Sequence, residues 1–186
     1  GLGKLTILPA ALTVKALDTL MFQGDSIPVF SSLITGLKNQ DTLISGPLFS
    51  LNPSYTGDAG VYQIVPYGAN LDCPECYQTT YQDGTLYVNP KGKFARKLKP
   101  YLVCVSVLKN DPSGLTYVAN FQCENDNATV VYVPVGANNF LSGAGAATAQ
   151  GTLPTLFYPG QSNSFQIKFN GDKITWTLQS YNVNQN

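Results

Sequence analysis

The four cysteines have the widest chemical range of any residues in this chain, and they fall into two groups. Cys73 and Cys76 have the C-x-x-C spacing of a redox-active pair, half of a zinc site or a small disulfide-closed loop. Redox catalysis uses a helix N-terminus that lowers the thiol pKa, and no helical pattern follows Cys76. A four-cysteine zinc site needs a second close pair, whereas Cys104 and Cys123 are 19 positions apart (123 minus 104). A structural loop is therefore the favoured interpretation, and a metal site is the alternative.

Cys104 and Cys123 lie on two expected strands, 101–108 and 115–123, which are joined by turn-forming residues at 110–114. A turn centred near 112–113 pairs residues whose numbers sum to about 227, which places Cys104 opposite Cys123. Opposite residues of a hairpin lie within about 5.5 Å at Cβ, close to the reach of a disulfide. The pattern predicts a cross-strand disulfide, and two buried free thiols are the alternative.

Histidine is absent from the sequence, and charged residues make up only 12% of it, with 11 basic and 11 acidic residues. The commonest general base and the commonest transition-metal ligand are therefore missing, and no Asp or Glu lies in a recognisable catalytic motif. We expect no catalytic, cofactor-binding or metal-binding residues and no enzyme activity. The balanced charge argues against a nucleic-acid partner, and no apolar run reaches the roughly 18 residues of a membrane helix, so we expect a mature, soluble segment.

Two further groups could contact a ligand. Glu124 to Asn127 form an oxygen-rich turn that could hold calcium, but the spacing lacks the D-x-[DN]-x-[DN]-G pattern, and Asx turns explain the composition equally well. Trp176 alternates with Ile174 and Leu178, as core residues of a strand do. An exposed Trp could stack on a sugar ring, so Trp176 is the candidate ligand contact, with a core position as the favoured alternative.

A short repeat suggests how the chain is organised. Residues 3–9 and 84–90 both read G-x-L-x-[IV]-x-P, at an offset of 81 (84 minus 3). We interpret residues 1–9 as the end strand of a preceding repeat and residues 10–90 as one complete module, so that the chain is a slice of a longer array. Within the module we expect a short helical turn over 37–43 and strands over 12–16, 28–37, 61–65 (closed by Pro66), 77–81 and 86–88.

The following residues predict a linker and a second domain. Five of the 11 basic residues fall within 91–99, which we interpret as a solvated basic linker, with an anionic-polymer contact as the alternative. Six strands are expected over 100–186, and Asn170-Gly171 predicts a hairpin between the last two. These features predict an antiparallel β-sandwich of the Ig-like kind. The strands are expected at 101–108, 115–123, 130–135, 155–158, 164–169 and 173–180.

One series of residues extends over most of the module at 10–90. It consists of Leu12-Thr13-Val14, Gly24-Asp25, Gly36-Leu37 with Asp41, Gly60 to Ile64 and Tyr77 to Leu86. The series resembles the bacterial MBG ("mostly beta-grasp") repeat, a tandem module of large surface-exposed and secreted proteins, particularly of Bacteroidetes. The chain departs from the usual pattern at Phe22-Gln23-Gly24, where a Tyr-Gly pair is common, and at the C-x-x-C.

The second half is similar to a small β-module appended to bacterial secreted and surface proteins. The residues that carry this similarity are Cys104-Val105, Tyr117 to Phe121, Glu124 to Asn127, Val133 to Phe140, Phe157 to Gly160, Phe169 to Gly171 and Ile174 to Leu178. Neither family brings an enzyme activity or catalytic residues. Together the resemblances imply a mainly β chain, with a β-grasp-like MBG module followed by the β-sandwich.

The resemblances also imply a place and a role. We expect a non-catalytic spacer or adhesion segment of a secreted or cell-surface multidomain bacterial protein, with neighbouring modules of the same chain and a surface glycan or protein ligand as partners. The alternative is a carbohydrate-binding or accessory module attached to an enzyme. Because exported proteins meet an oxidising environment, the resemblance favours disulfides at Cys73–Cys76 and Cys104–Cys123.

Overall fold

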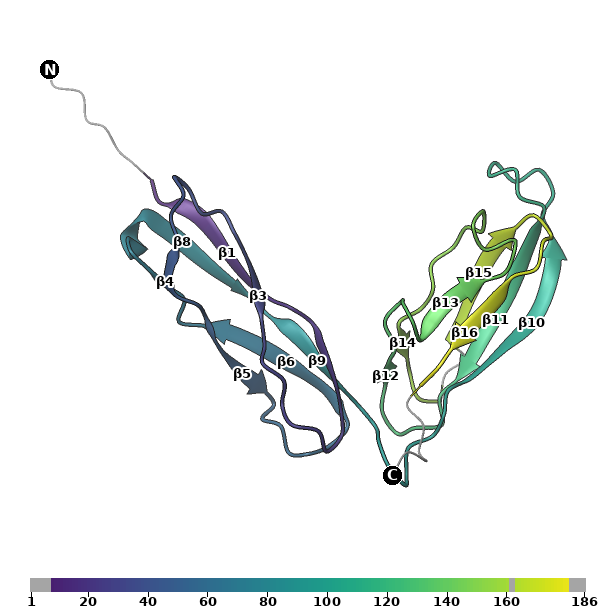
Figure 1. The fold of residues 1–186 in the computed structure, drawn as a ribbon, viewed down its shortest axis with the longest axis horizontal. Coiled ribbons are helices and arrows are strands. Elements are labelled where there is room, and N and C mark those ends of the chain that lie inside the picture. Colours follow the sequence, from purple (N-terminus) through teal and green to yellow (C-terminus); the bar gives the residue numbers. More distant parts are fainter. Residues whose placement is uncertain (1–7, 161–162, 181–186) are drawn as a thin grey trace, which may run out of the picture. The chain divides into compact units, whose positions relative to one another are not determined.

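The computed structural model describes residues 8–160 and 163–180, which form two compact units divided between Val88 and Asn89. These residues form sixteen strands and one short 3-10 helix (Figure 1), so the prediction of a mainly β chain is confirmed. Of the end strand expected over residues 1–9, residues 1–7 lie outside the described residues. No helix in the described part of the chain is long and apolar enough to cross a membrane.

The first unit contains three sheets. Its four-stranded sheet has the order β2-β9-β6-β5, its three-stranded sheet has the order β3-β1-β8, and β4 pairs with β7. The elements are β1 (Ala10–Ala16), β2 (Thr19–Phe22), β3 (Ser32–Thr35), β4 (Leu43–Ser45), β5 (Leu48–Asn52), β6 (Gly60–Tyr67), β7 (Asn70–Leu71), the 3-10 helix η1 (Pro74–Cys76), β8 (Tyr77–Gln82) and β9 (Gly84–Asn89).

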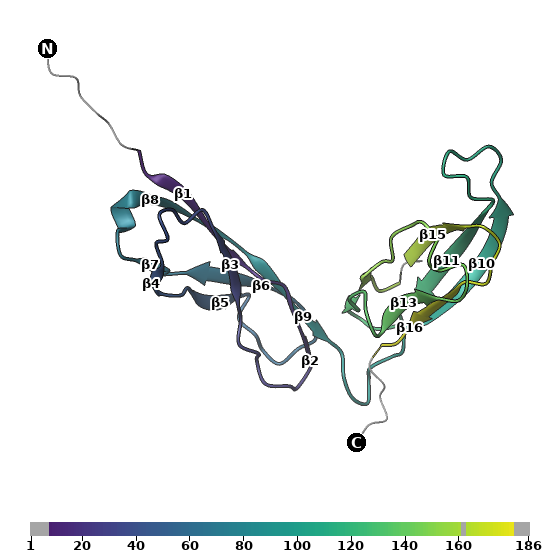
Figure 2. The ribbon, with the colours of Figure 1, turned by 45° about the horizontal axis from the view of Figure 1, so that its top comes forward.

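Two pairs of strands pass from one sheet into the other. Strand β1 leads into β2, and β8 leads into β9 with only Asp83 between them (Figures 1 and 2). Strands β1 and β8 run parallel, from Ala10 opposite Tyr77 to Lys15 opposite Gln82. Where the chain changes sheets, a Cβ on Gly84 would lie 2.7 Å from the carbonyl oxygen of Ala16, so this crossing requires glycine.

The alternation of apolar residues in β1 explains its place in the unit. Leu12, Val14 and Ala16 are fully buried, as the period of a half-buried strand predicts. Ala16 packs with Ile64 and others in one core cluster, whereas Leu12 packs with Tyr77 in a second cluster. One strand therefore contributes to both cores of the first unit.

Three expectations for the first unit need correction. The strand expected over 28–37 is confined to β3, and the helical turn expected over 37–43 is a backbone turn in which Asn39 and Gln40 have left-handed φ values of 52° and 65°. Strand β6 continues through Pro66 because beyond Ile64 its described ladder is with β5 alone. Proline is tolerated at such an edge position.

The second unit surrounds one core with three sheets. The first sheet has the order β10-β11-β15, and the others are the pairs β12-β14 and β13-β16. Side chains from all three, including Phe121, Phe157 and Trp176, form one buried cluster. The strands are β10 (Lys99–Val107), β11 (Tyr117–Glu124), β12 (Val131–Tyr132), β13 (Asn139–Ser142), β14 (Leu156–Phe157), β15 (Asn163–Phe169) and β16 (Thr175–Leu178).

The hairpin predicted at Asn170-Gly171 is wrong. Strand β15 pairs with β11, and β16 pairs with β13, so these two residues carry the chain from one sheet to another. The local Asn-Gly signal is satisfied by a bend, in which the Asp172 amide donates to the Asn170 side chain. The core decides the pairing, because Ile167 and Trp176 both face it.

The basic stretch 91–99 is not a free linker in this structure. Ala95 and Leu98 are buried, and Leu98 belongs to the core of the second unit. The amide of Arg96 donates to Asn127 Oδ1 at 2.7 Å, and Asn127 Nδ2 donates back to the Arg96 carbonyl at 2.8 Å. Lys93, Arg96, Lys97 and Lys99 are exposed, whereas the buried Leu98 anchors the backbone to the second unit.

A buried asparagine organises the centre of the second unit. Asn139 is 0% exposed, and its Nδ2 donates to the carbonyls of Val133 at 3.0 Å and Pro154 at 2.7 Å. Its Oδ1 accepts the indole N–H of Trp176 at 2.9 Å. Buried polar groups need such partners, so this one side chain satisfies two loop carbonyls and the indole at once.

An ion pair at the β10–β11 turn should make the second unit sensitive to acid. Lys168 Nζ lies 2.6 Å from Asp111 Oδ2, and this pair, with hydrogen bonds from Ser113, lowers the pKa of the Asp111 carboxyl from 3.8 to about 2. Because the pKa is lowered on folding, the stabilisation is present above the unfolded pKa and is lost as the pH falls from about 4 towards 2. Asp111→Asn should therefore flatten the loss of stability in that window.

Urea unfolding followed by the fluorescence of Trp176 at several pH values between 2 and 5 measures this slope. Lys168→Met removes the other partner of the pair and should flatten the same window. Identical slopes for the parent chain and both variants would contradict the assignment.

Candidate functional site

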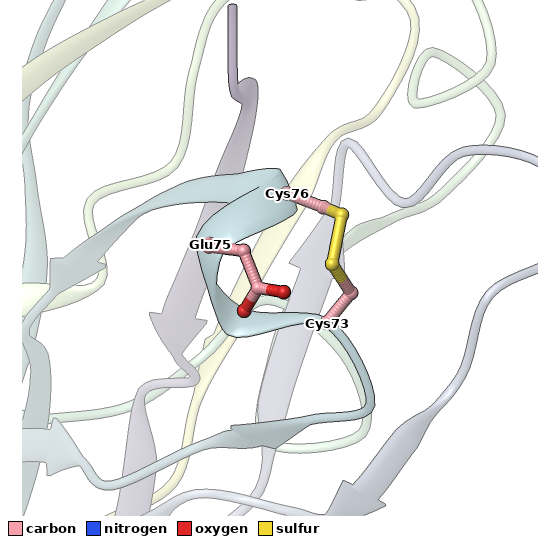
Figure 3. Close-up of side chains that lie close together, drawn as sticks. All are labelled: Cys73, Glu75 and Cys76. Atoms are coloured by element: carbon pink, nitrogen blue, oxygen red, sulfur yellow. A yellow bond between two sulfur atoms is a disulfide. The ribbon is translucent and has the colours of Figure 1, made fainter.

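The C-x-x-C loop lies in the first unit and connects β7 to β8. Cys73 and Cys76 form a disulfide with a Cα–Cα distance of 5.3 Å, and η1 begins directly after Cys73 and ends at Cys76 (Figure 3). The next residue, Tyr77, donates a hydrogen bond to Asp41 Oδ2 at 2.6 Å and accepts one from the Lys38 amide at 2.9 Å. The hydrogen bond to Asp41 is the main cause of a raised pKa of the Tyr77 hydroxyl. The predicted disulfide at Cys73–Cys76 is thus present, and Tyr77 ties its loop to the 38–41 turn.

The same loop contains the metal-ligand cluster of the described residues. The two sulfurs and a carboxylate oxygen of Glu75 lie within 4.8 Å of one another. In the oxidised loop both sulfurs are bonded to each other, and a thiolate is the form that binds zinc. The geometry therefore matches a covalent clip, with Glu75 exposed beside it.

The disulfide predicted between Cys104 and Cys123 is wrong. Both are free thiols, since Cys104 pairs with Asn120 and Cys123 pairs with Pro100. The Leu108 amide donates to the Thr116 carbonyl at the loop between β10 and β11, and the pairing of these two strands is shifted by three positions from the predicted register. A β-bulge between Leu102 and Cys104 shifts the pairing again. Cys104 is left exposed and Cys123 is buried in the core, so the two thiols cannot meet.

The two free thiols should differ sharply in reactivity. Cys123 is 0% exposed, and burial raises the pKa of its thiol from 9.0 to about 12. Such a rise lowers the thiolate fraction at pH 8 roughly 1000-fold. Iodoacetamide should therefore modify Cys104 alone in the folded protein and both cysteines after denaturation without reductant, as intact-mass analysis shows. Cys104→Ser should abolish native labelling, and labelling of Cys123 without denaturant would contradict the assignment.

The oxygen-rich turn at Glu124 to Asn127 is structural. Asn125 Oδ1 accepts the amide of Asn127 at 2.9 Å, which is the Asx turn considered above, and Asn125 Nδ2 donates to the carbonyls of Thr129 and Phe157. Asp126 lies 2.6 Å from Lys99. These bonds engage the side chains in holding loops and the start of β10, so the turn is not arranged around a cation.

Trp176 occupies the core, as its alternation with neighbouring residues predicts. It is 8% exposed and packs edge-on to Phe165 at 4.7 Å and to Phe121 at 5.7 Å between ring centroids. Its N–H is bonded to Asn139, and its ring is buried and stacked on Phe157, so neither the polar edge nor an exposed ring face is presented to a sugar. Trp176 is therefore not a sugar-stacking platform in this structure.

Sequence analysis missed a groove beside β10. Its volume is about 380 Å³, and its lining is mainly apolar, with Asp172 and Lys173 contributing charge. Strand β10 is exposed along its whole length, including Leu102 and Val105, whose partners in β11 are buried. The signal was available, because residues 101–105 and 107 are apolar or cysteine without the alternation of a half-buried strand. The apolar lining of the groove includes Leu102, Val105, Phe121, Phe169, Ile174 and Trp176.

These features define a mainly β chain of two units, in which Cys73 and Cys76 form a structural disulfide. Residues 12–87 match the family model described as "MBG domain (YGX type)", and the first unit is accordingly an MBG domain. This confirms the resemblance found in the sequence, whereas the resemblance of the second unit is not covered by the match. Comparison with curated proteins and with solved structures gives no match for the chain.

Proposed function

We propose that the chain is a non-catalytic segment of a secreted or cell-surface bacterial protein, in which it acts as a spacer and adhesion module. The observation that carries this proposal is the MBG domain at residues 12–87, since MBG domains are repeat modules of extracellular surface proteins. The Cys73–Cys76 disulfide supports it, because disulfides persist in oxidising compartments. Its partners would be neighbouring modules of the same protein and a surface ligand.

We further propose that the two units fold separately. The core clusters of residues up to 88 and of residues from 98 onward share no member. Such self-contained cores are what independently folding modules need. This arrangement suits a chain assembled from repeated parts.

The location is tested with an antibody raised against this chain, applied to cells that produce the full-length protein. We expect labelling of intact cells or of the medium, and loss of the cell-bound signal after protease treatment of intact cells. A signal that appears only after lysis would overturn the proposal. A cytoplasmic protein detected in parallel controls for cell integrity.

The alternative function, a carbohydrate-binding module, has less support from the structure. The candidate sugar contact, Trp176, is buried and bonded to Asn139. We therefore expect no specific binding of the chain on a glycan array. Binding to one glycan class that is lost on substitution of exposed Tyr101, beside the groove, would favour the alternative instead.

A further inference from the structure

The first strand of the MBG domain, β1, runs parallel to β8, which continues into the last strand, β9, so tension along the chain slides β1 past β8. We propose that this domain carries tensile load through a shear clamp, defined as the β1–β8 ladder and the crossing where β1–β2 meets β8–β9. The proposal deepens the spacer function and rests on it for its use in the cell. The mechanical property itself belongs to the domain and can be measured directly.

The clamp begins with the parallel ladder. Tension reaches the domain through Ala10, at the start of β1, and leaves it through the end of β9 (Figures 1 and 2). Because β8 runs parallel to β1 and continues into β9, the two ends are pulled in opposite directions along neighbouring strands. The hydrogen bonds of the ladder cross between these strands, so they share the load and must yield together.

The crossing extends the clamp beyond the ladder. The amide of Thr85, in β9, donates to Asp18 Oδ1 at 2.8 Å, and Asp18 lies between β1 and β2. Gly84 approaches the backbone of Ala16 so closely that a Cβ there would lie 2.7 Å from the Ala16 carbonyl oxygen. Beyond this point β2 lies beside β9 in the four-stranded sheet. The entering and leaving segments are therefore neighbours in the three-stranded and the four-stranded sheets of the domain.

Burial protects the ladder on one face. Leu12, Val14 and Ala16 are all 0% exposed, so sliding β1 would expose three core side chains together. Exposure of this apolar surface raises the barrier to unfolding. Forced unfolding depends on that barrier, so the strand arrangement and the core both oppose tension.

The same domain provides a matched control geometry. Strands β6 and β9 are antiparallel, with Gly60 opposite Val88. A force applied at exposed Asp58 and beyond the end of β9 would act at one end of this ladder and open its hydrogen bonds one after another. Peeling and shearing can thus be compared in one folded protein.

The experiment is single-molecule force spectroscopy of the complete, oxidised chain. The two pulling handles are attached to unnatural amino acids introduced at chosen positions. One chain carries handles at Pro9 and Lys93, and the other carries them at Asp58 and Lys93, so the second unit lies outside most of the load path. Unfolding should release roughly 240 Å in the first geometry and roughly 110 Å in the second, which identifies each event. Equal melting temperatures of the two handled chains confirm that both are folded.

We expect the unfolding force in the first geometry to be about twofold higher or more, because the ladder shares the load. Asp18→Ala should lower that force and leave the peeling force unchanged, whereas Asp72→Ala, at an exposed site outside the clamp, should alter neither. Equal forces in the two geometries would overturn the clamp and leave the location test of the spacer function unaffected. Failure of the location test would likewise leave a measured clamp in place.

Discussion

Replacing Gly36 with alanine should destabilise the MBG domain by about 3–5 kcal/mol. Gly36 has a φ of +105°, a conformation that costs an L-residue about 1–3 kcal/mol. A Cβ at this position would also lie 2.2 Å from the carbonyl oxygen of Ala11. Ala11 belongs to β1, whose backbone is held by ladders to both β3 and β8, so the clash is not relieved by movement of a flexible side chain.

Gly57→Ala separates the cost of the left-handed backbone conformation from the cost of the clash with Ala11. Gly57 has a similar φ of +98°, but no atom lies within 4 Å of the Cβ position, so this variant should lose only about 1–2 kcal/mol. In calorimetry of the full chain, the melting transition of the first unit should move to a lower temperature in each variant. The fluorescence of Trp176, the single tryptophan, should show that the stability of the second unit is unchanged. Equal losses in the two glycine variants would contradict the clash, and a matching loss in the second unit would contradict separate folding.

Replacing Asn139 with alanine should destabilise the second unit by about 3–5 kcal/mol, because three buried groups lose their partner. These groups are the carbonyls of Val133 and Pro154 and the indole N–H of Trp176. Alanine has no side-chain donor or acceptor, so the variant loses all three of these hydrogen bonds. Urea unfolding followed by Trp176 fluorescence measures the loss.

Asn120→Ala is the matched control. Asn120 is on β11 of the same unit, and its amide bonds to Gln166 and Cys104 at the surface, where water replaces a lost partner. This variant should change stability by less than about 1 kcal/mol. Similar losses for the two asparagines would contradict the organising role of Asn139.

The part of the fold predicted from the sequence is the part set by local periodicity. Leu12, Val14 and Ala16 alternate with polar residues, and the strand they predict is β1. The Cys73–Cys76 clip is also local, because the two residues are separated by a single short turn. The MBG resemblance rests on such local signals in their order along the chain.

The errors arose where a distant contact outweighed a local signal. The Cys104–Cys123 pairing failed because the loop register and one bulged residue, Val103, decide which residues meet, and neither leaves a mark in the strand composition. Asn170-Gly171 failed because burial of Ile167 and Trp176 in a common core draws the flanking strands into different sheets. The buried network of Asn139 could not be foreseen, since two of its three partners, Pro154 and Trp176, lie 15 and 37 positions away in the sequence.

The bulge in β10 also bears on the solubility of the chain. β10 is an uncovered edge strand of nine residues, and apart from Lys99 it carries no charge, which is the composition of a template for fibrous assembly. Pro100 lacks the amide that a continuous ladder needs, and the bulge at Val103 breaks the regular spacing of the edge. The bulge that made the disulfide prediction wrong therefore also disfavours pairing of the β10 edge with a strand of another molecule.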